Sequence, residues 1–207
     1  MSVQLERPEA RNTLGLVFAG GRATRMGGVN KGLVLFGGRP LAGIAIERLA
    51  PQVRRVAVSA NRDAAKFLAL GAAAAVPDRL TGFPGPLAAI DAAADVMDAC
   101  EQWLFTVPCD VPYFPKDLLG TLASAFDGKT PAYAARAAGR SQNTFALIHR
   151  SLLPTVAPFV GRGDRKLGLW LEEQGAREVE VEAEPFFFAN VNSPDELQAL
   201  EKAGHPL

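Results

Sequence analysis

Residues 14–35 read LGLVFAGGRATRMGGVNKGLVL, and this stretch decides the fold that we expect for the chain. It opens on an apolar run, 14–18, which is typical of a strand buried on both faces in a parallel sheet. Glycines follow this run at once, and residues 19–38 contain arginine and lysine but no acid. Glycine lets the backbone turn sharply and bring its N–H groups close to a bound group. Consecutive N–H groups form an anion site, to which arginine and lysine add full charges.

A phosphate chain is the natural ligand for such a loop, so the stretch predicts phosphate binding behind a buried strand. The alternative is a plain glycine-rich loop with solvated cations. Two standard phosphate motifs are absent from the sequence. Lys31 is followed by Gly32, so there is no G-x-x-x-x-G-K-[ST] P-loop, and no G-x-G-x-x-G follows the strand. The second absence disfavours a nicotinamide or flavin dinucleotide.

Composition narrows the class of protein. The chain has 207 residues, with 22 Lys plus Arg against 22 Asp plus Glu. That length suits one domain, which we place at 13–207 behind a disordered tail over 1–12. The charge balance gives no reason to expect a nucleic-acid or membrane-surface partner.

The sequence also bears on the compartment. Cys100 and Cys109 make neither a disulfide framework nor a zinc site, and free thiols fit a reducing cytoplasm. Residues 1–11 contain acids and no apolar core, so they do not read as a signal peptide. No apolar run reaches the ~20 residues that a membrane span needs. We therefore expect a cytoplasmic protein.

Short apolar runs alternate with segments of helical spacing, which is typical of a doubly wound, mostly parallel α/β sheet flanked by helices. Strands are expected at 14–18, 53–58, 74–76 and 103–107, and as a pair at 131–135 and 144–148 around a polar loop at 139–143. Helices are expected at 41–49, 64–70, 86–95, 116–126, 152–159, 167–171 and 193–202, and the one over 152–159 should be interrupted at Pro154 or Pro158. In the first helix the apolar spacing places Glu47 and Arg48 on the polar side. The last helix opens with a capping box formed by Ser193 and Glu196.

The three strongest strands end at Gly20-Gly21, at Asn61 and at Asp110. Because ligands bind beyond the carboxyl ends of the strands in such sheets, a glycine cradle, an amide and a carboxylate meet at one edge. Mg²⁺ usually takes one or two protein carboxylates together with phosphate oxygens. Asp110 beside a phosphate loop therefore predicts metal-assisted transfer on a nucleoside triphosphate. The alternative is a turn-forming Asp before Val111-Pro112.

Several segments of the sequence resemble the molybdenum cofactor guanylyltransferases of the nucleotidyltransferase superfamily. The matching segments are Ala19-Gly20-Gly21, Arg25-Met26-Gly27-Gly28, Lys31-Gly32, Pro108-Cys109-Asp110-Val111-Pro112-Tyr113 and Asn190-Val191-Asn192-Ser193-Pro194-Asp195-Glu196-Leu197. The resemblance implies a Rossmann-like nucleotidyltransferase fold whose N-terminal half binds the nucleotide and whose C-terminal half binds the acceptor. It also implies transfer of GMP from GTP to the terminal phosphate of molybdopterin, with release of pyrophosphate and Mg²⁺ as cofactor. Molybdoenzyme maturation proteins would be further partners.

The resemblance assigns roles to particular residues. Catalytic roles fall to Lys31, Arg25 and Asp110, of which Asp110 is also the metal ligand. The nucleotide would be bound by Phe18, Ala19, Gly20, Gly21, Lys31, Ser59, Asn61, Asp78 and Asp110. The acceptor would be bound by Asn190, Asn192, Arg165 and Lys166. The structural alternatives are a solvated arginine at 25, turn and cap residues at 78, 190 and 192, and a helix start with solvated charges at 165 and 166.

The sequence departs from the family pattern at three places. Asn30 stands where the family usually has an acid, Ser59 where an amide is expected, and Gln142-Asn143 where a His-Pro pair is usual. Two other readings therefore stay open. One is a transferase that uses CTP or loads a sugar phosphate, and the other is a non-catalytic nucleotide-binding scaffold that delivers the cofactor to molybdoenzymes.

Overall fold

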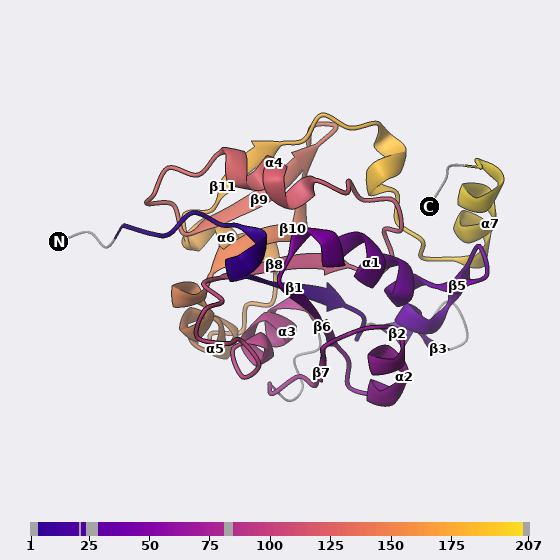
Figure 1. Cartoon of the computed structure of the whole chain (residues 1–207), viewed down its shortest axis with the longest axis horizontal. Coiled ribbons are helices and arrows are strands. Elements are labelled where there is room, and N and C mark those ends of the chain that lie inside the picture. Colours follow the sequence, from indigo (N-terminus) through magenta and orange to yellow (C-terminus); the bar gives the residue numbers. More distant parts are fainter. Residues whose placement is uncertain (1–3, 21, 24–28, 81–84, 205–207) are drawn as a thin grey trace.

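The computed structural model describes residues 4–20, 22–23, 29–80 and 85–204. Its centre is a seven-stranded sheet with the order β11-β9-β10-β8-β1-β6-β7 (Figure 1). The strands are β1 (Thr13–Phe18), β6 (Arg55–Ser59), β7 (Ala74–Val76), β8 (Trp103–Pro108), β9 (Ala132–Ala137), β10 (Arg140–His149) and β11 (Arg177–Glu180). Every neighbouring pair is parallel except the two pairs that include β10. The predicted mostly parallel α/β sheet is confirmed.

Helices cover both faces of this sheet. Figure 1 shows α1 and α4 on one side and α3 and α5 on the other. The helices are α1 (Leu41–Leu49), α2 (Ala64–Ala69), α3 (Pro86–Ala93), α4 (Leu118–Ser124), α5 (Val156–Gly161), α6 (Leu167–Glu173) and α7 (Pro194–Lys202). Within β1, Val17 packs into the core with α1, α2 and α4, whereas Leu14 and Leu16 pack into the core with α3, α5 and α6. This alternation buries the first strand on both faces, as its unbroken apolar run predicts.

Short elements complete the chain. They are the hairpins β2 (Arg22–Ala23) with β3 (Val29–Asn30) and β4 (Leu35–Phe36) with β5 (Arg39–Pro40), and the 3-10 turns η1 (Ala10–Asn12), η3 (Lys31–Leu33), η4 (Ala50–Gln52), η5 (Arg150–Thr155) and η6 (Pro185–Phe188). The β4–β5 hairpin and α7 lie on the side toward which the β1 arrow points in Figure 1. A small apolar cluster around Phe36 and Tyr113 joins them, with Leu197 and Leu200 of α7 packed against it. The C-terminal helix therefore stands beside the carboxyl ends of the parallel strands.

The expected disordered tail is wrong for residues 4–12. The backbone N–H of Leu5 donates to Gly128 O at 3.0 Å, and the indole of Trp103 donates to Glu6 O at 2.9 Å. These contacts hold the segment because the Trp103 indole N–H is buried and takes its hydrogen-bond partner from it. Residues 1–3 lie outside the described part of the chain.

One further expectation about the elements needs correction. The polar stretch 139–143 is not a loop, because residues 140–143 form the start of β10, with a register shift between Gln142 and Ala146. The expected interruption of the helix over 152–159 is confirmed, because the proline at 154 lies in η5 and α5 begins at Val156. No helix in the described ranges is long and apolar enough to cross a membrane.

Gly15 of β1 permits the close approach of α1. A Cβ built there would lie 2.7 Å from Leu49 Cδ2 and 3.0 Å from Val53 Cγ2. We expect Gly15→Ala to lower the free energy of unfolding by about 2–3 kcal/mol, because it overpacks a filled core. Urea denaturation measures this loss. The matched control is Gly120→Ala in α4, where nothing lies within 4 Å of the added Cβ. That change should raise the stability by about 0.5–1 kcal/mol through helix propensity.

Candidate active site

Three loops leave neighbouring strands side by side at the carboxyl edge of the sheet. Phe18 at the end of β1 is paired with Ser59 of β6 and with Pro108 of β8. Beyond this row, Ala19 N–H donates to Ser59 O at 3.2 Å and Cys109 N–H donates to Phe18 O at 3.2 Å. The structure thus brings Ala19 and Gly20, which begin the glycine-rich segment, to the same place as the Asn61 loop and the Asp110 loop. The sequence predicted this convergence from the strand ends.

Lys31 is the centre of the site. Its Nζ donates to Asp110 Oδ2 at 2.5 Å and to Asn192 Oδ1 at 2.6 Å. The side chains of Lys31 and Asp110 are 15% and 17% exposed, so the ion pair is largely shielded from bulk water. Lys31, Asp110 and Asn192 come from the glycine-rich segment, the end of β8 and the segment before α7, respectively. The first two were predicted as catalytic residues and the third as an acceptor-binding residue.

The neighbours of Lys31 in the sequence, Asn30 and Gly32, fix the position of its backbone. Asn30 caps η3, because its Oδ1 accepts from Gly32 N–H at 3.3 Å. Its Nδ2 donates to Asp63 Oδ2 at 3.3 Å. Gly32 has no room for a side chain, since a Cβ there would lie 2.9 Å from the Cβ of Ala19. Lys31 therefore leaves a turn whose position is set by packing and by a cap.

Asp110 is held through its backbone and through the segment that follows it. Val191 N–H donates to Asp110 O at 2.8 Å, which ties the C-terminal segment to this loop. The guanidinium of Arg48 in α1 donates to Tyr113 O and Phe114 O, both at 2.9 Å. The expectation that Arg48 lies on the polar side of its helix is wrong, because the residue is only 7% exposed. Burial lowers the pKa of Arg48, and the two carbonyl oxygens accept from its Nε and one of its terminal nitrogens.

The start of α7 fixes Asn192. Ser193 Oγ accepts from Glu196 N–H at 3.2 Å, which is the predicted N-cap. Glu196 Oε2, however, accepts from Asn192 N–H at 2.7 Å. The carboxylate of the expected capping box thus reaches one residue further back and anchors the backbone of Asn192. Asn190 is exposed.

A second polar pair lies at the ends of β6 and β7. Asn61 Nδ2 donates to Asp78 Oδ2 at 2.8 Å, and Asp78 N–H donates to Asn61 Oδ1 at 2.8 Å. Asp78 Oδ1 is inaccessible to water and has no hydrogen-bond partner among the residues described. Gly20 stands next to this pair, because a Cβ at Gly20 would lie 3.9 Å from Asn61 Nδ2 and 3.6 Å from Ser59 Oγ. The pair therefore offers an acceptor beside the glycine-rich segment.

The oxygen atoms around Lys31 have the chemistry of a cation site. Asp110 Oδ2 and Asn192 Oδ1 converge on one ammonium group, and carboxylate and amide oxygens are ligands that Mg²⁺ accepts. In the described ranges, no group of three or more His, Cys, Asp or Glu residues is placed to hold a metal. A metal here would need phosphate oxygens to complete its ligands, as the sequence predicted. Burial raises the pKa of the neighbouring Cys109 thiol, which keeps it neutral and structural.

Two of the remaining predicted site residues, Gly21 and Arg25, lie outside the described part of the chain. Arg165 and Lys166 are exposed and precede α6, on the sheet face that α3 and α5 cover. The start of α6 packs on β10, because a Cβ at Gly168 would lie 2.6 Å from Asn143 Nδ2. That part of β10 borders the end of β8, where Thr106 Oγ1 donates to Thr144 O at 2.9 Å.

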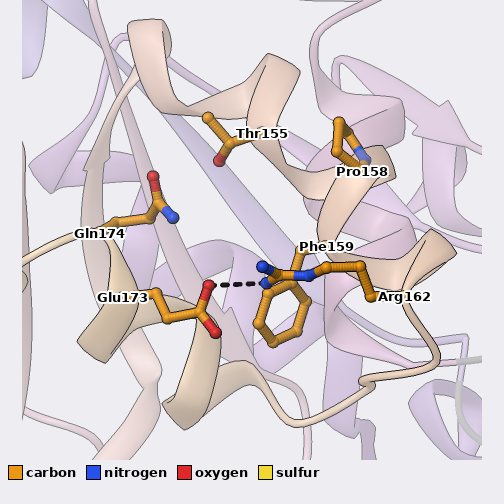
Figure 2. A pocket seen from close by; sticks show the side chains of 6 residues that line it. All are labelled: Thr155, Pro158, Phe159, Arg162, Glu173 and Gln174. Atoms are coloured by element: carbon orange, nitrogen blue, oxygen red, sulfur yellow. Dashed lines mark hydrogen bonds and ion pairs between the residues drawn. The ribbon is translucent and has the colours of Figure 1, made fainter.

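A pocket elsewhere contains none of the predicted site residues. It lies between α5 and α6 and is lined by Thr155, Pro158, Phe159, Arg162, Glu173 and Gln174 (Figure 2). Arg162 lies over the ring of Phe159 at 5.1 Å and is ion-paired to Glu173 at 2.6 Å. The charged groups of this pocket therefore satisfy each other.

Comparisons with known proteins agree with this geometry. A family model described as the MobA-like NTP transferase domain matches residues 15–179. The chain is 41% identical over 204 residues to the molybdenum cofactor guanylyltransferase of Burkholderia orbicola, covering 94% of this chain and 98% of that protein. It is 39% identical over 193 residues to the Yersinia pestis protein of the same name, covering 92% and 96%.

Solved structures share the fold. Molybdopterin-guanine dinucleotide biosynthesis protein A from Archaeoglobus fulgidus matches with a TM-score of 0.72 at 20% identity, covering 92% of this chain and 98% of that one. A 4-diphosphocytidyl-2C-methyl-D-erythritol synthase from Anaerococcus prevotii matches with a TM-score of 0.70 at 10% identity, covering 95% and 100%. At these identities the likeness concerns the fold alone.

Proposed function

The chain belongs to the MobA-like NTP transferase domain family, and from this premise we propose that it transfers GMP from GTP to the terminal phosphate of molybdopterin. The observation that carries the proposal is the convergence of Lys31, Asp110 and Asn192 beside the glycine-rich segment that follows β1. An ammonium group and a carboxylate at this edge suit a triphosphate and its metal ion. The proposed products are molybdopterin guanine dinucleotide and pyrophosphate.

The reaction is an in-line displacement at the α-phosphorus of GTP. An oxygen of the molybdopterin phosphate forms the new P–O bond, and the bond from the α-phosphorus to the bridging oxygen breaks. Pyrophosphate leaves with that electron pair. The attacking phosphate is already ionised, so no general base is needed. The positive charge of Lys31 stabilises the negative charge that grows on the phosphate oxygens.

We assign Asp110 as the protein ligand of Mg²⁺, with the side-chain oxygen of Asn192 as a second donor. When bound, Mg²⁺ neutralises phosphate charge and orients the triphosphate. The Lys31 ammonium, which donates to Asp110 and Asn192, would contact the phosphates beside these oxygens.

The rest of the site divides between nucleotide and acceptor. Phe18, Ala19, Gly20, Gly21 and Ser59 would cradle the nucleotide, and Arg25 would contact the leaving pyrophosphate. Asn190, Arg165 and Lys166 would face the acceptor phosphate. This division follows the proposed organisation of the chain, with a nucleotide-binding N-terminal half and an acceptor-binding C-terminal half. A cytoplasmic location and contacts with molybdoenzyme maturation proteins complete the proposal.

We assign Asp78 to recognition of the guanine base. Its unpartnered Oδ1 can accept from the ring N–H and the amino group, which are both donors. In Asp78→Asn the new side-chain NH₂ group must face either the N–H groups of the base or Nδ2 of Asn61. In both cases two hydrogen-bond donors face each other. We expect kcat/KM for GTP to fall about 30- to 100-fold, with a smaller preference for GTP over ATP. Steady-state kinetics with GTP and with ATP measure both changes. The control is Asp117→Asn, because Asp117 is exposed and its side chain makes no N-cap hydrogen bond. An unchanged preference for GTP would remove Asp78 from base recognition.

The proposal is tested by following pyrophosphate release with molybdopterin, Mg²⁺ and, in parallel, GTP, CTP and ATP. We expect release that depends on molybdopterin and is fastest with GTP. Faster release with CTP would identify a cytidylyltransferase. Release that needs a sugar phosphate instead of molybdopterin would identify the other transferase class. Binding of a nucleotide without any release would identify a scaffold.

A further inference from the structure

Asn30 precedes Lys31, and both ends of its side-chain amide are hydrogen-bonded. The structure places a carboxylate against it from another loop. Asp63, which follows β6, accepts from Asn30 Nδ2 at 3.3 Å, while Asn30 Oδ1 accepts from Gly32 N–H. The amide of Asn30 thus spans the gap between the turn that carries Lys31 and the loop after β6.

Asp63 is itself held in place. It has φ of 60°, in the left-handed region that non-glycine residues rarely adopt, and it is the residue before α2. Its Oδ1 pairs with Lys66 Nζ at 2.8 Å. Such a backbone conformation persists only where the surroundings fix it. These contacts leave Oδ2 directed at Asn30, and the bonds from Lys66 and Asn30 lower the pKa of Asp63. Arg62 is the other charged group that favours its ionised form.

We propose that the hydrogen-bonded pair of Asn30 and Asp63 positions Lys31. The pair requires one donor and one carboxylate. Two carboxylates at this distance would repel each other and would push η3 away from the β6 loop. Neither residue is assigned a contact with the nucleotide, so both act through the place at which they hold the Lys31 turn. The inference rests on the proposed function only in that Lys31 must act on a triphosphate.

The test exchanges the two groups in the full-length protein. The variants are Asn30→Asp, Asp63→Asn and the double exchange, each made in the wild-type chain and in a Lys31→Gln background. Three quantities are measured: kcat and KM for the nucleotide by steady-state kinetics, and the dissociation constant for binding of Mg²⁺–GTP to the protein by calorimetry. Melting temperatures of all variants monitor the fold.

We expect Asn30→Asp to lower kcat/KM about 10- to 30-fold, mainly through kcat, because Lys31 acts on charge that grows in the transition state. The double exchange restores one donor and one carboxylate, and should return kcat/KM to within about threefold of wild type. In the Lys31→Gln background, Asn30→Asp should cost less than about twofold, because the group that it positions is absent. A purely structural role would give the same loss in both backgrounds.

Two results would overturn the inference. One is a double exchange as impaired as Asn30→Asp alone, and the other is an equal loss with and without Lys31. If Asn30→Asp does not fold, Asp63→Ala replaces it, because that change removes the acceptor and leaves the cap on Gly32 in place. If the wild type prefers another triphosphate, the proposed function fails. The same variants then test the positioning of Lys31 with that triphosphate by calorimetry.

Discussion

Asp110→Asn is expected to lower kcat about a thousandfold while the melting temperature stays within a few degrees of wild type. The change keeps the size of the side chain but removes the negative charge, so the proposed metal loses its one carboxylate ligand. The fold should tolerate the change, because the bond from Val191 N–H goes to the backbone oxygen of Asp110. Pyrophosphate release at saturating GTP and Mg²⁺ measures the loss.

A Mn²⁺ titration gives a second readout for Asp110. In the presence of GTP, Asp110→Asn should bind Mn²⁺ at least about tenfold more weakly than wild type, as seen by electron paramagnetic resonance. The control, Asp117→Asn, removes the charge of an exposed aspartate and should change neither kcat nor the affinity for Mn²⁺. Full metal-dependent turnover by Asp110→Asn would exclude Asp110 as the metal ligand.

Lys31→Gln is expected to lower kcat about a hundredfold and to change KM for GTP much less. The ammonium of Lys31 is proposed to stabilise charge that develops on the phosphates, so its loss acts on the transition state more than on the bound substrate. Lys129→Gln, at an exposed position, is the matched control for removal of a lysine charge. Steady-state kinetics on both variants measure the effect.

The same lysine variant should have an opposite effect on metal binding in the absence of nucleotide. Lys31 pairs with Asp110 at 2.5 Å, so its removal frees the carboxylate for a divalent cation. We expect Mn²⁺ to bind the nucleotide-free Lys31→Gln protein several-fold more tightly than wild type, by about 1 kcal/mol. Weaker Mn²⁺ binding together with weaker catalysis would instead indicate that the variant has lost its fold.

The sequence predicts the centre of the fold well because that information is local. The run at 14–18 and the run at 103–107 are apolar over a strand length, and each becomes a buried strand. Asp110 follows the second run, so its place at the carboxyl edge needs no knowledge of distant contacts. Polar strands carry no such signal: β11 (Arg177–Glu180) reads Arg-Glu-Val-Glu at the sheet edge and was missed.

The residues that position the site could not be predicted in the same way. Arg48 lies where helical periodicity indicates a solvent-facing side chain, yet it is buried because backbone oxygens 65 and 66 positions along the chain accept its donors. Asn30 and Asp63 meet across 33 positions. Nothing in the residues adjacent to either one indicates the pairing. Contacts of this kind depend on how the loops meet in space, which a pattern along the chain does not record.

The central claim is that this site transfers a nucleoside monophosphate from a triphosphate to a phosphate acceptor. The most direct measurement follows GTP labelled at the α-phosphorus during incubation with the wild-type protein, Mg²⁺ and molybdopterin. The account predicts that the label enters a molybdopterin dinucleotide while the unlabelled β- and γ-phosphates leave together as pyrophosphate. Release of orthophosphate, or an acceptor that remains unlabelled, would contradict it.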